Sequence, residues 1–319
     1  MMHILFINTL DKLDILKDSS LMMALTFKQA GAATYLLFEK DFYYQNNAEK
    51  TFRVYDFEGS FKEGSYYLND FSLLSERTVT LDASMTLHMR IDPPFDTRYL
   101  MYLWILQTFK KTGVRIINDP AFVTLNNEKL VAYEGPSAMP TYIGTSFDKF
   151  YQFIQDELAK NHEYIIIKPL DLYQGLGVEK LKLADFNKTK WQKKFADKIF
   201  ALKGPLVAQE YIPSVEKGEV RAIFFHGKEL GSILKIPPAG GFLANIASGA
   251  TYREVQLTPE QRELCEKFCA KVGLEEVPWI AFDILGNIIS EANITCPGLL
   301  VEVSTALGKN LAKDILQGI

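Results

Sequence analysis

Cysteine is scarce in this chain, whose 319 residues include only Cys265, Cys269 and Cys296. An odd number of cysteines, in a sequence with no sign of secretion, indicates free thiols rather than a disulfide framework. Cys265 and Cys269 are four residues apart in an expected helix, so they share one face. A zinc site would need further ligands, and none of the four histidines stands at a suitable spacing. Packing on a helix face is therefore the better interpretation of this cysteine pair.

An excess of positive charge is also missing. The chain has 35 Lys and Arg residues against 39 Asp and Glu residues, a net charge of −4. This balance gives no support for a surface that binds nucleic acid or an anionic membrane. The first residues lack the basic and apolar regions of a signal peptide, and no later stretch is apolar enough to span a bilayer. We therefore expect a cytoplasmic protein with neither a nucleic-acid nor a membrane partner.

Two familiar sets of catalytic residues are absent as well. The spacing of glycines and Lys-Ser/Thr in a Walker A phosphate loop does not occur. No Ser-His-Asp or Cys-His arrangement is evident. Cys296, beside Pro297, is better interpreted as part of a pocket wall than as a nucleophile. The chemistry has to be sought in what the chain does contain.

Strands and helices alternate in the first part of the chain. Buried strands are predicted by four short apolar runs, at 3–8, 33–38, 86–90 and 114–118. The segment 18–31 predicts an amphipathic helix capped by Asp18 or Ser19, and Asp96 is expected to cap a second, longer helix. Such alternation is typical of a parallel α/β sheet. For the segment 40–84 we expect a hairpin with an acidic and aromatic surface.

The pattern changes after residue 120. The later elements are expected in this order: a helix near 146–160, a strand at 163–170, mostly strands from 178 to 235 with a hairpin tip at 225–228, a helix near 258–272, a hairpin at about 282–295, and a closing helix from 301. We predict an α/β protein with an N-terminal parallel α/β domain at 1–119. A small central domain at 120–204 and a largely antiparallel C-terminal domain at 205–319 follow.

The stretch FDILGNIISEANITCPG at 282–298 places oxygen-bearing side chains in an apolar hairpin. A buried carboxylate is costly unless a cation, a hydrogen-bond donor or water accompanies it. A three-residue turn beginning at Gly286 would place Asp283 directly opposite Glu291, with Asn293 further along the same face, whereas a two-residue turn would put the acids on opposite faces. The first register makes a set of hard ligands suited to Mg²⁺. The alternative is a pair of solvent-facing acids on an edge strand.

Two lysines are candidates for phosphate binding. Lys168 ends an apolar strand and precedes a loop with Gly175 and Gly177, where backbone N–H groups can approach phosphate oxygens. Lys129 lies in a short helical piece. Both have a plain alternative, because lysines at strand ends and on helices are usually only solvated. The run VAQEYI at 207–212 is either an ordinary strand or a hinge whose backbone pairs with an adenine edge.

Several stretches, taken together, resemble ATP-grasp ligases. They are NEK at 127–129, IIIKPLD at 165–171, AQEYI at 208–212, GEVR at 218–221, KIPPAGG at 235–241, NIASG at 245–249 and FDILGNIISEANIT at 282–295. Within that superfamily, LKDSS at 16–20 and MRIDPPFDT at 89–97 are similar to segments of bacterial glutathione synthetases. This resemblance runs in order across nearly the whole chain. It implies an ATP-grasp fold, with an N-terminal α/β domain, a central lid domain and a C-terminal domain, and ATP held between two antiparallel sheets.

The resemblance also implies roles for individual residues. The nucleotide contacts would be Lys129, Lys168, Gly175, Gly177, Gln209, Glu210, Tyr211, Ile212 and Glu219. Arg221 and Lys168 would act on the transferred phosphoryl group. Asp283, Glu291 and Asn293 would carry two Mg²⁺ ions, with Mn²⁺ as a possible substitute. The substrate contacts would be Ser19, Ser20, Arg90, Lys235, Asn245, Thr295, Cys296, Pro297 and Gly298, although Ser19 and Ser20 are also plausible helix caps.

The reaction that the resemblance implies phosphorylates the C-terminal carboxylate of γ-glutamylcysteine, and glycine then attacks the acyl phosphate to form glutathione. Phosphoryl transfer needs positioning and charge neutralisation more than a protein nucleophile, and lysines, an arginine and metal ions supply both. The acyl phosphate must be kept from water, so the loop at 237–250 is the candidate lid. A homo-oligomer, either a tetramer or a dimer, is implied as well.

Three stretches depart from the family pattern. The phosphate loop has Leu172, Tyr173 and Gln174 where the family is glycine-rich. In the candidate lid, Phe242 and Leu243 replace polar residues that include an arginine, and the run TCPG replaces a serine-containing stretch. These departures bear on the substrate more than on the use of ATP. They keep open an ATP-grasp peptide ligase with a different carboxylate or amine, and, as a second alternative, a non-catalytic nucleotide-binding protein.

Overall fold

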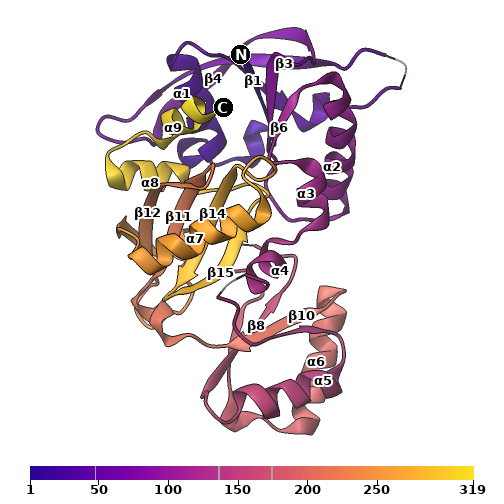
Figure 1. The fold of residues 1–319 in the computed structure, drawn as a ribbon, viewed down its shortest axis with the longest axis vertical. Coiled ribbons are helices and arrows are strands. Elements are labelled where there is room, and N and C mark those ends of the chain that lie inside the picture. Colours follow the sequence, from indigo (N-terminus) through magenta and orange to yellow (C-terminus); the bar gives the residue numbers. More distant parts are fainter. Residues whose placement is uncertain (47, 136, 174) are drawn as a thin grey trace.

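The computed structural model describes residues 1–46, 48–135, 137–173 and 175–319, so the prediction about Gln174 lies outside the described residues. The strands form three sheets arranged along an elongated molecule (Figure 1). The sheet of the N-terminal part lies at one end, a five-stranded sheet lies in the middle, and a four-stranded sheet lies at the far end.

The first sheet has six strands in the order β4-β3-β2-β1-β5-β6. Their bounds are β1 Met2–Ile7, β2 Ala33–Phe38, β3 Thr51–Phe61, β4 Leu68–Thr80, β5 Met85–Arg90 and β6 Arg115–Ile117. The pairs β1–β2, β1–β5 and β5–β6 are parallel, as the alternation of strands and helices predicts. β3 and β4 form an antiparallel hairpin that widens the sheet, which confirms the hairpin expected at 40–84.

Two helices cover this sheet, and each begins at a capping aspartate. The side chain of Asp18 accepts a hydrogen bond from the N–H of Leu21 at 2.7 Å and begins α1 (Ser19–Gln29). The side chain of Asp96 accepts one from the N–H of Tyr99 at 2.9 Å and begins α2 (Thr97–Phe109). These capping side chains accept hydrogen bonds from N–H groups that have no partner inside the helix. Asp18, not Ser19 or Ser20, is therefore the cap of the first helix.

The four-stranded sheet is antiparallel, in the order β7-β10-β8-β9. Its elements are β7 Thr141–Gly144, β8 Tyr164–Pro169, β9 Glu179–Lys182, β10 Leu206–Glu210 and the covering helices α5 Phe147–Phe153 and α6 Lys188–Leu202. The prediction of mostly strands from 178 to 235 is wrong for α6. Trp191 and Phe195 are four residues apart and both are buried under the sheet, a helical spacing that the charged residues around them obscure.

β10 joins this sheet by pairing with both β7 and β8, so the sheet continues beyond residue 204, where the central domain was expected to end. We propose that the central domain ends after β10 instead. The short helices α3 (Pro120–Leu125) and α4 (Glu128–Tyr133) connect it to the first sheet.

The third sheet is antiparallel, in the order β13-β12-β11-β14-β15. Its strands are β11 Glu219–Phe225, β12 Lys228–Ile236, β13 Thr251–Glu254, β14 Trp279–Leu285 and β15 Ile288–Asn293, and α7 Pro259–Val272 packs on it. The closing helix is two helices, α8 (Leu300–Leu307) and α9 (Leu311–Gly318). Gly308, at φ 62°, leaves the helical region and ends α8, and Asn310 caps α9.

The two C-terminal helices unite the first and third sheets. Leu21 of α1, Phe225 of β11, Leu300 of α8 and Ile315 of α9 belong to one buried cluster. Figure 1 shows α8 and α9 between the two sheets. The N-terminal part and the C-terminal sheet therefore share a core, while the four-stranded sheet has its own. Within the described ranges, we find no helix with the length and apolar character needed to cross a bilayer.

Candidate active site

A cavity of about 580 Å³ opens between the four-stranded and five-stranded sheets, and the start of α1 closes one end of it. Its wall includes residues of β8 and β10 on one side and of β11, β12, β14 and β15 on the other. All the site residues that the sequence predicts line this cavity except Gly177 and Pro297. The structure thus brings together residues as distant in the chain as Ser19 and Gly298.

Gly177 and Pro297 stand behind the cavity wall. Gly177 has φ +73°, and a Cβ atom there would lie 2.7 Å from Cγ of Pro169, so packing and backbone conformation both require glycine. The carbonyl oxygen of Pro297 accepts a hydrogen bond from Nη2 of Arg90 at 3.0 Å. Both residues shape the wall and do not face the cavity.

The β14–β15 hairpin places its two acids opposite each other as predicted, but its turn differs from the predicted one. Asp283 is directly opposite Glu291, which confirms the predicted register. The predicted three-residue turn is wrong, because the strands end at Leu285 and resume at Ile288. The register shifts between Asp283 and Ile284, which makes Ser290 the extra residue of a β-bulge. The bulge returns both acids to one face.

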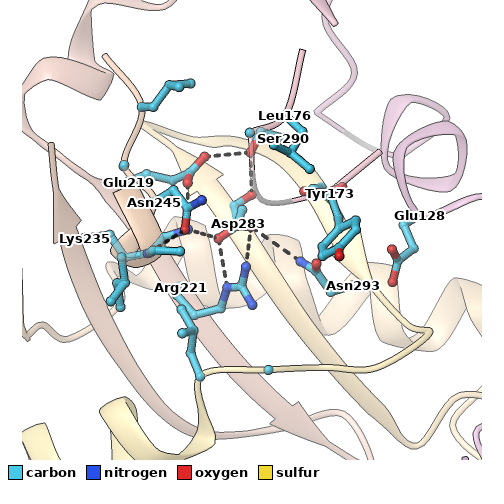
Figure 2. Close-up of a pocket in the computed structure, with 18 of the residues that line it drawn as sticks. Glu128, Tyr173, Leu176, Glu219, Arg221, Lys235, Asn245, Asp283, Ser290 and Asn293 are labelled. Carbon is cyan, nitrogen blue, oxygen red and sulfur yellow. Dashed lines mark hydrogen bonds and ion pairs between the residues drawn. The ribbon is translucent and has the colours of Figure 1, made fainter. Parts of the chain in front are cut away.

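Two cross-strand pairs bring basic groups to Asp283. Arg221 is paired with Asp283 across β11 and β14, and Glu219 is paired with Lys235 across β11 and β12. Because alternate residues of a strand share a face, all four side chains meet on one side of the sheet (Figure 2). In the run GEVR, Glu219 and Arg221 are two residues apart and so share one face of β11, where Lys235 of the run KIPP meets them from β12.

Asp283 is almost fully buried and doubly ion-paired. Nε and Nη2 of Arg221 donate to its two carboxylate oxygens at 2.9 and 2.6 Å. Nζ of Lys235 donates to Oδ1 at 2.6 Å and also lies 2.7 Å from Oε2 of Glu219. Burial alone would raise the pKa of Asp283, but the charges and hydrogen bonds of Arg221 and Lys235 outweigh it and hold that pKa far below its usual value. The carboxyl group is therefore ionised at any physiological pH.

Glu291 and the two predicted phosphate lysines form a second cluster. Nζ of Lys129 lies 2.9 Å from Oε1 of Glu291 and donates to the carbonyl oxygen of Leu172 at 2.7 Å. Nζ of Lys168 lies 5.2 Å from the ring centroid of Tyr133. Burial lowers the pKa of Lys168 to about 8, against the opposing charge of Glu291. Both lysines face the cavity, so neither is merely solvated.

Sequence reasoning missed Glu128. Its Oε1 atom accepts hydrogen bonds from the N–H of Ile294 at 2.7 Å and from the N–H and hydroxyl of Thr295, both at 2.8 Å. Burial, and then the charge of Glu291, raises the pKa of this carboxyl group. Glu128 fixes the segment after β15 that forms the cavity wall. Glu128 is part of the run NEK at 127–129, but the two residues that it contacts are 166 and 167 residues further along the chain. No local sequence pattern therefore predicts these contacts.

Arg90 organises the end of the cavity nearest the first sheet. Its Nε donates to Oγ of Ser20 at 3.0 Å, and its guanidinium lies 4.4 Å from the ring of Trp279. The Nη1 atom of Arg90 is buried without a hydrogen-bond partner among the described residues. Oγ of Ser19 accepts from the N–H of Leu300 at 3.1 Å. These contacts hold the guanidinium in one orientation.

Cys296 lies at the same end of the cavity. Its thiol is 3.4 Å from Oδ1 of Asp92, and burial raises its pKa well above the usual value. A nucleophilic cysteine needs a lowered pKa, so this environment agrees with a wall residue.

The segment after β10 forms another part of the wall. Nε2 of Gln209 donates to Oγ1 of Thr141 at 2.9 Å, and Nδ1 of His162 lies 3.0 Å from Glu210. Phe242 of the candidate lid meets Tyr211 edge-on, with ring centroids 6.3 Å apart.

The candidate lid at 237–250 touches the phosphate loop through apolar side chains. A Cβ atom built on Gly175 would lie 3.6 Å from Cδ2 of Leu243. The side chain of Asn245 accepts a hydrogen bond from the N–H of Ala247 at 3.1 Å and lines the cavity below this contact. The residues Leu243 and Phe242, which depart from the family pattern, therefore lie at the site itself.

The hairpin residues fit a partly protein-coordinated magnesium ion. In the described parts of the chain, no three His, Cys, Asp or Glu side chains gather in a way suited to a metal. Mg²⁺, however, is usually bound by one or two carboxylates, with water and phosphate oxygens completing its octahedron. Asp283 and Glu291 supply those carboxylates. Asn293, whose Nδ2 donates to the carbonyl oxygen of Ala281 at 2.9 Å, lies beside Asp283 (Figure 2).

Comparison with known proteins agrees with this geometry. The family profile described as "Prokaryotic glutathione synthetase, ATP-grasp domain" matches residues 128–308, and the profile of the N-terminal domain of the same family matches residues 1–123. The chain belongs to the prokaryotic glutathione synthetase family. The membership that the motifs predicted is thereby confirmed.

Curated glutathione synthetases are similar over most of the chain. The enzyme of Prochlorococcus marinus subsp. pastoris is 29% identical over 231 residues, which cover 72% of each chain. That of Pseudomonas syringae pv. tomato is 26% identical over 314 residues, which cover 97% of this chain and 94% of the relative.

Solved structures show that this glutathione synthetase family member has the ATP-grasp fold. The D-cycloserine synthetase DcsG superposes with a TM-score of 0.66 at 14% identity, over 99% of both chains. The ATP-grasp ligase PsnB, complexed with a phosphomimetic variant of its minimal precursor, Mg and ADP, superposes with a TM-score of 0.61 at 11% identity, over 100% of this chain and 99% of the other. The predicted fold class is confirmed.

Proposed function

We propose that the protein is an ATP-dependent carboxylate–amine ligase that joins glycine to γ-glutamylcysteine through an acyl phosphate. The observation that carries this proposal is the single cavity in which Asp283 and Glu291 share one face and stand among Lys129, Lys168 and Arg221. Membership of the glutathione synthetase family supports the choice of substrates.

The basic side chains would neutralise the charge that phosphoryl transfer moves. Lys129 and Lys168 would contact the nucleotide phosphates, and Arg221, held by its bidentate pair with Asp283, would face the transferred group. Mg²⁺ held by Asp283, Glu291 and Asn293 would supply Lewis-acid stabilisation of the phosphate oxygens. We propose ATP and Mg²⁺ as the cofactors, with two ions.

The nucleotide base would lie along the segment after β10, between the two antiparallel sheets. Gln209, Tyr211 and Ile212 line that part of the cavity, and Glu219 lies next to it for the ribose. Gly175, at φ +74°, lets the loop after Lys168 turn back over the phosphates.

The peptide substrate would occupy the end of the cavity near the first sheet. Arg90 has a fixed guanidinium with a free Nη1, which suits a charge-assisted bond to a carboxylate. Ser19, Ser20 and the wall from Thr295 to Gly298 lie around it. Lys235 and Asn245 border the region where the acceptor would enter.

A second candidate is an ATP-grasp peptide ligase that uses another carboxylate or amine. The observation that favours it is the apolar contact of Leu243 with the phosphate loop, where Leu172 also lines the cavity. An apolar wall there would suit a larger acceptor than glycine.

The deciding experiment is an ADP-release assay with ATP and Mg²⁺. We expect γ-glutamylcysteine plus glycine to give the fastest ADP release in a panel of dipeptides and amines, with glutathione identified by mass spectrometry. Preference for another dipeptide or amine would replace the proposed substrates with those of the second candidate. ATP binding with no turnover on any pair would contradict a ligase altogether and leave a non-catalytic nucleotide-binding protein.

A further inference from the structure

Glu302, in the first turn of α8, is an acid of the cavity wall that the mechanism above leaves without a role. It is 3% exposed, and its Oε2 atom is buried without a hydrogen-bond partner among the described residues. An unpaired buried oxygen of this kind is costly. The adjacent Val301 and Val303 are fully buried and apolar, so a position that served packing alone would favour a similar side chain.

The position of Glu302 lies between the two ends of the proposed reaction. The start of α8 is tied to the peptide end of the cavity, because the N–H of Leu300 donates to Oγ of Ser19 at 3.1 Å. The charged groups that act on Glu302 are Lys17, Arg221 and Asp18. Arg221 belongs to the phosphoryl-transfer cluster, and Asp18 caps the helix that begins with Ser19. Glu302 therefore borders the place where an acyl phosphate would form.

We propose that Glu302 is the general base that accepts a proton from the attacking amine, an inference that rests on the proposed ligase function. The acceptor, a small amino acid such as glycine, arrives as an ammonium ion that cannot attack. Oε2 of Glu302 takes one proton, and the nitrogen lone pair then forms the C–N bond at the acyl carbon. The C–O bond to phosphate breaks, and its electron pair leaves with the phosphate. The second amine proton goes to that phosphate, and Glu302 returns its proton to water.

The environment of the carboxyl group suits this role. Burial, with a smaller contribution from Asp18, raises the pKa of Glu302 above its ordinary value, while Lys17 and Arg221 oppose the shift. A carboxylate with a raised pKa is a stronger base toward the attacking amine. The charge of Glu302 contributes to the raised pKa of Tyr67, whose hydroxyl is hydrogen-bonded to that of Tyr252 of β13 at 2.8 Å.

The test compares two acceptors in Glu302→Gln. Peptide synthesis with glycine should fall roughly 10²–10⁴-fold, the contribution expected of a general base. Hydroxylamine is largely uncharged at neutral pH and attacks an acyl phosphate without prior loss of a proton. Formation of the acyl hydroxamate from ATP and γ-glutamylcysteine should therefore stay near the wild-type rate. A role in folding or in phosphoryl transfer would lower both rates together.

Control variants define the outcome that overturns the proposal. Glu302→Asp keeps a carboxylate and should retain part of the glycine reaction, while Glu263→Gln, at an exposed site on α7, should behave as wild type. Equal loss of both reactions in a variant that still binds ATP, measured by thermal shift, overturns the base role, as does unchanged glycine activity. If Glu302→Gln does not bind ATP, the same comparison in Glu302→Asp decides, and equal loss again overturns it.

The wild-type enzyme separates this inference from the proposed function. If wild type forms no hydroxamate with γ-glutamylcysteine, the proposed carboxylate substrate is wrong whatever Glu302 does. If wild type forms hydroxamate but uses an amine other than glycine, only the acceptor is wrong, and the comparison of Glu302→Gln is made with that amine.

Discussion

The carboxyl groups of this one cavity have pKa values shifted in opposite directions, because their surroundings differ. Asp283 stays ionised because Arg221 and Lys235 donate directly to it. Glu128 and Glu302 have weaker compensation from neighbouring charges, so burial raises their pKa values. Asp283 is therefore suited to holding a metal ion, and Glu302 to exchanging a proton.

Lys168 carries a pH-dependent prediction. Burial lowers its pKa to about 8 in the ligand-free protein, so it is partly neutral at pH 8 to 9. Nucleotide phosphates favour the charged form and raise the pKa in the complex. ATP binding should therefore take up a proton above pH 8, and ATP affinity should fall as pH rises from 8 toward the pKa of the complex, by up to about tenfold per pH unit. Calorimetry in two buffers of different ionisation enthalpy measures this uptake.

Substitution isolates the lysine responsible. Lys168→Arg stays charged at all these pH values, so its ATP affinity should not change between pH 7 and 9 apart from the titration of ATP itself. Lys182→Arg, at the exposed last residue of β9, should keep the wild-type pH dependence. An unchanged pH dependence in Lys168→Arg would show that another group takes up the proton.

At the scale of elements, the β14–β15 hairpin depends on one inserted residue. Ser290 occupies the bulge. Its hydroxyl shares its one proton between the backbone carbonyl oxygen of Asp283, at 3.1 Å, and Oε1 of Glu219, at 3.2 Å. Gly286, at φ 60°, permits the tight turn before it. Without the bulge, a two-residue turn places Asp283 and Glu291 on opposite faces.

Glu291→Gln tests this shared face, because it removes one of the two carboxylates and leaves the backbone pairing unchanged. We expect ADP release to fall by orders of magnitude, because the two carboxylates no longer share a metal ion. Ser290→Ala keeps the register and loses only two hydrogen bonds, so it should lower the free energy of unfolding in urea by about 1–3 kcal/mol and keep most of the turnover. Near-normal turnover in Glu291→Gln would show that the second carboxylate on this face is not required.

At the scale of the whole molecule, the cavity is the joint product of all three sheets. The four-stranded sheet reaches it through β8 and β10, the five-stranded sheet through β11 and β12, and the first sheet through Arg90. Figure 1 shows the four-stranded sheet connected to the rest at one end. Val207 of β10 already belongs to the core of the five-stranded sheet, and a nucleotide bound between the sheets would add further contacts between them.

Hydrogen exchange should report this bridging. With Mg²⁺ and a non-hydrolysable ATP analogue, we expect slower exchange both around Gly175 and in the loop 237–250, because each covers the nucleotide from one side. At a concentration 100 times the Kd, the analogue should add about 2.7 kcal/mol to the free energy of unfolding. The helix α7, none of whose residues lines the cavity, serves as the control. Protection of one loop alone would contradict a nucleotide held between the sheets.

The sequence by itself determined what depends on neighbours along the chain. The period of the apolar residues predicted the parallel strands of the first sheet, and Asp18 and Asp96 marked where two helices begin. The ordered motifs predicted the family and the ATP-grasp fold. These features follow from backbone hydrogen-bond repeats and short-range caps, which act over a few residues.

Tertiary structure alone decided the features that join distant segments. Three such features are the bulge at Ser290, the hydrogen bonds of Glu128 to Thr295 and the burial of Glu302 in the cavity wall, all of which depend on how sheets and helices pack. The sequence does not show whether a carboxylate is exposed to water or buried in a cavity, and only the surrounding protein sets its partners and its pKa. For that reason the list of candidate residues could be written from the sequence, whereas the division of tasks among the acids could be proposed only from the folded chain.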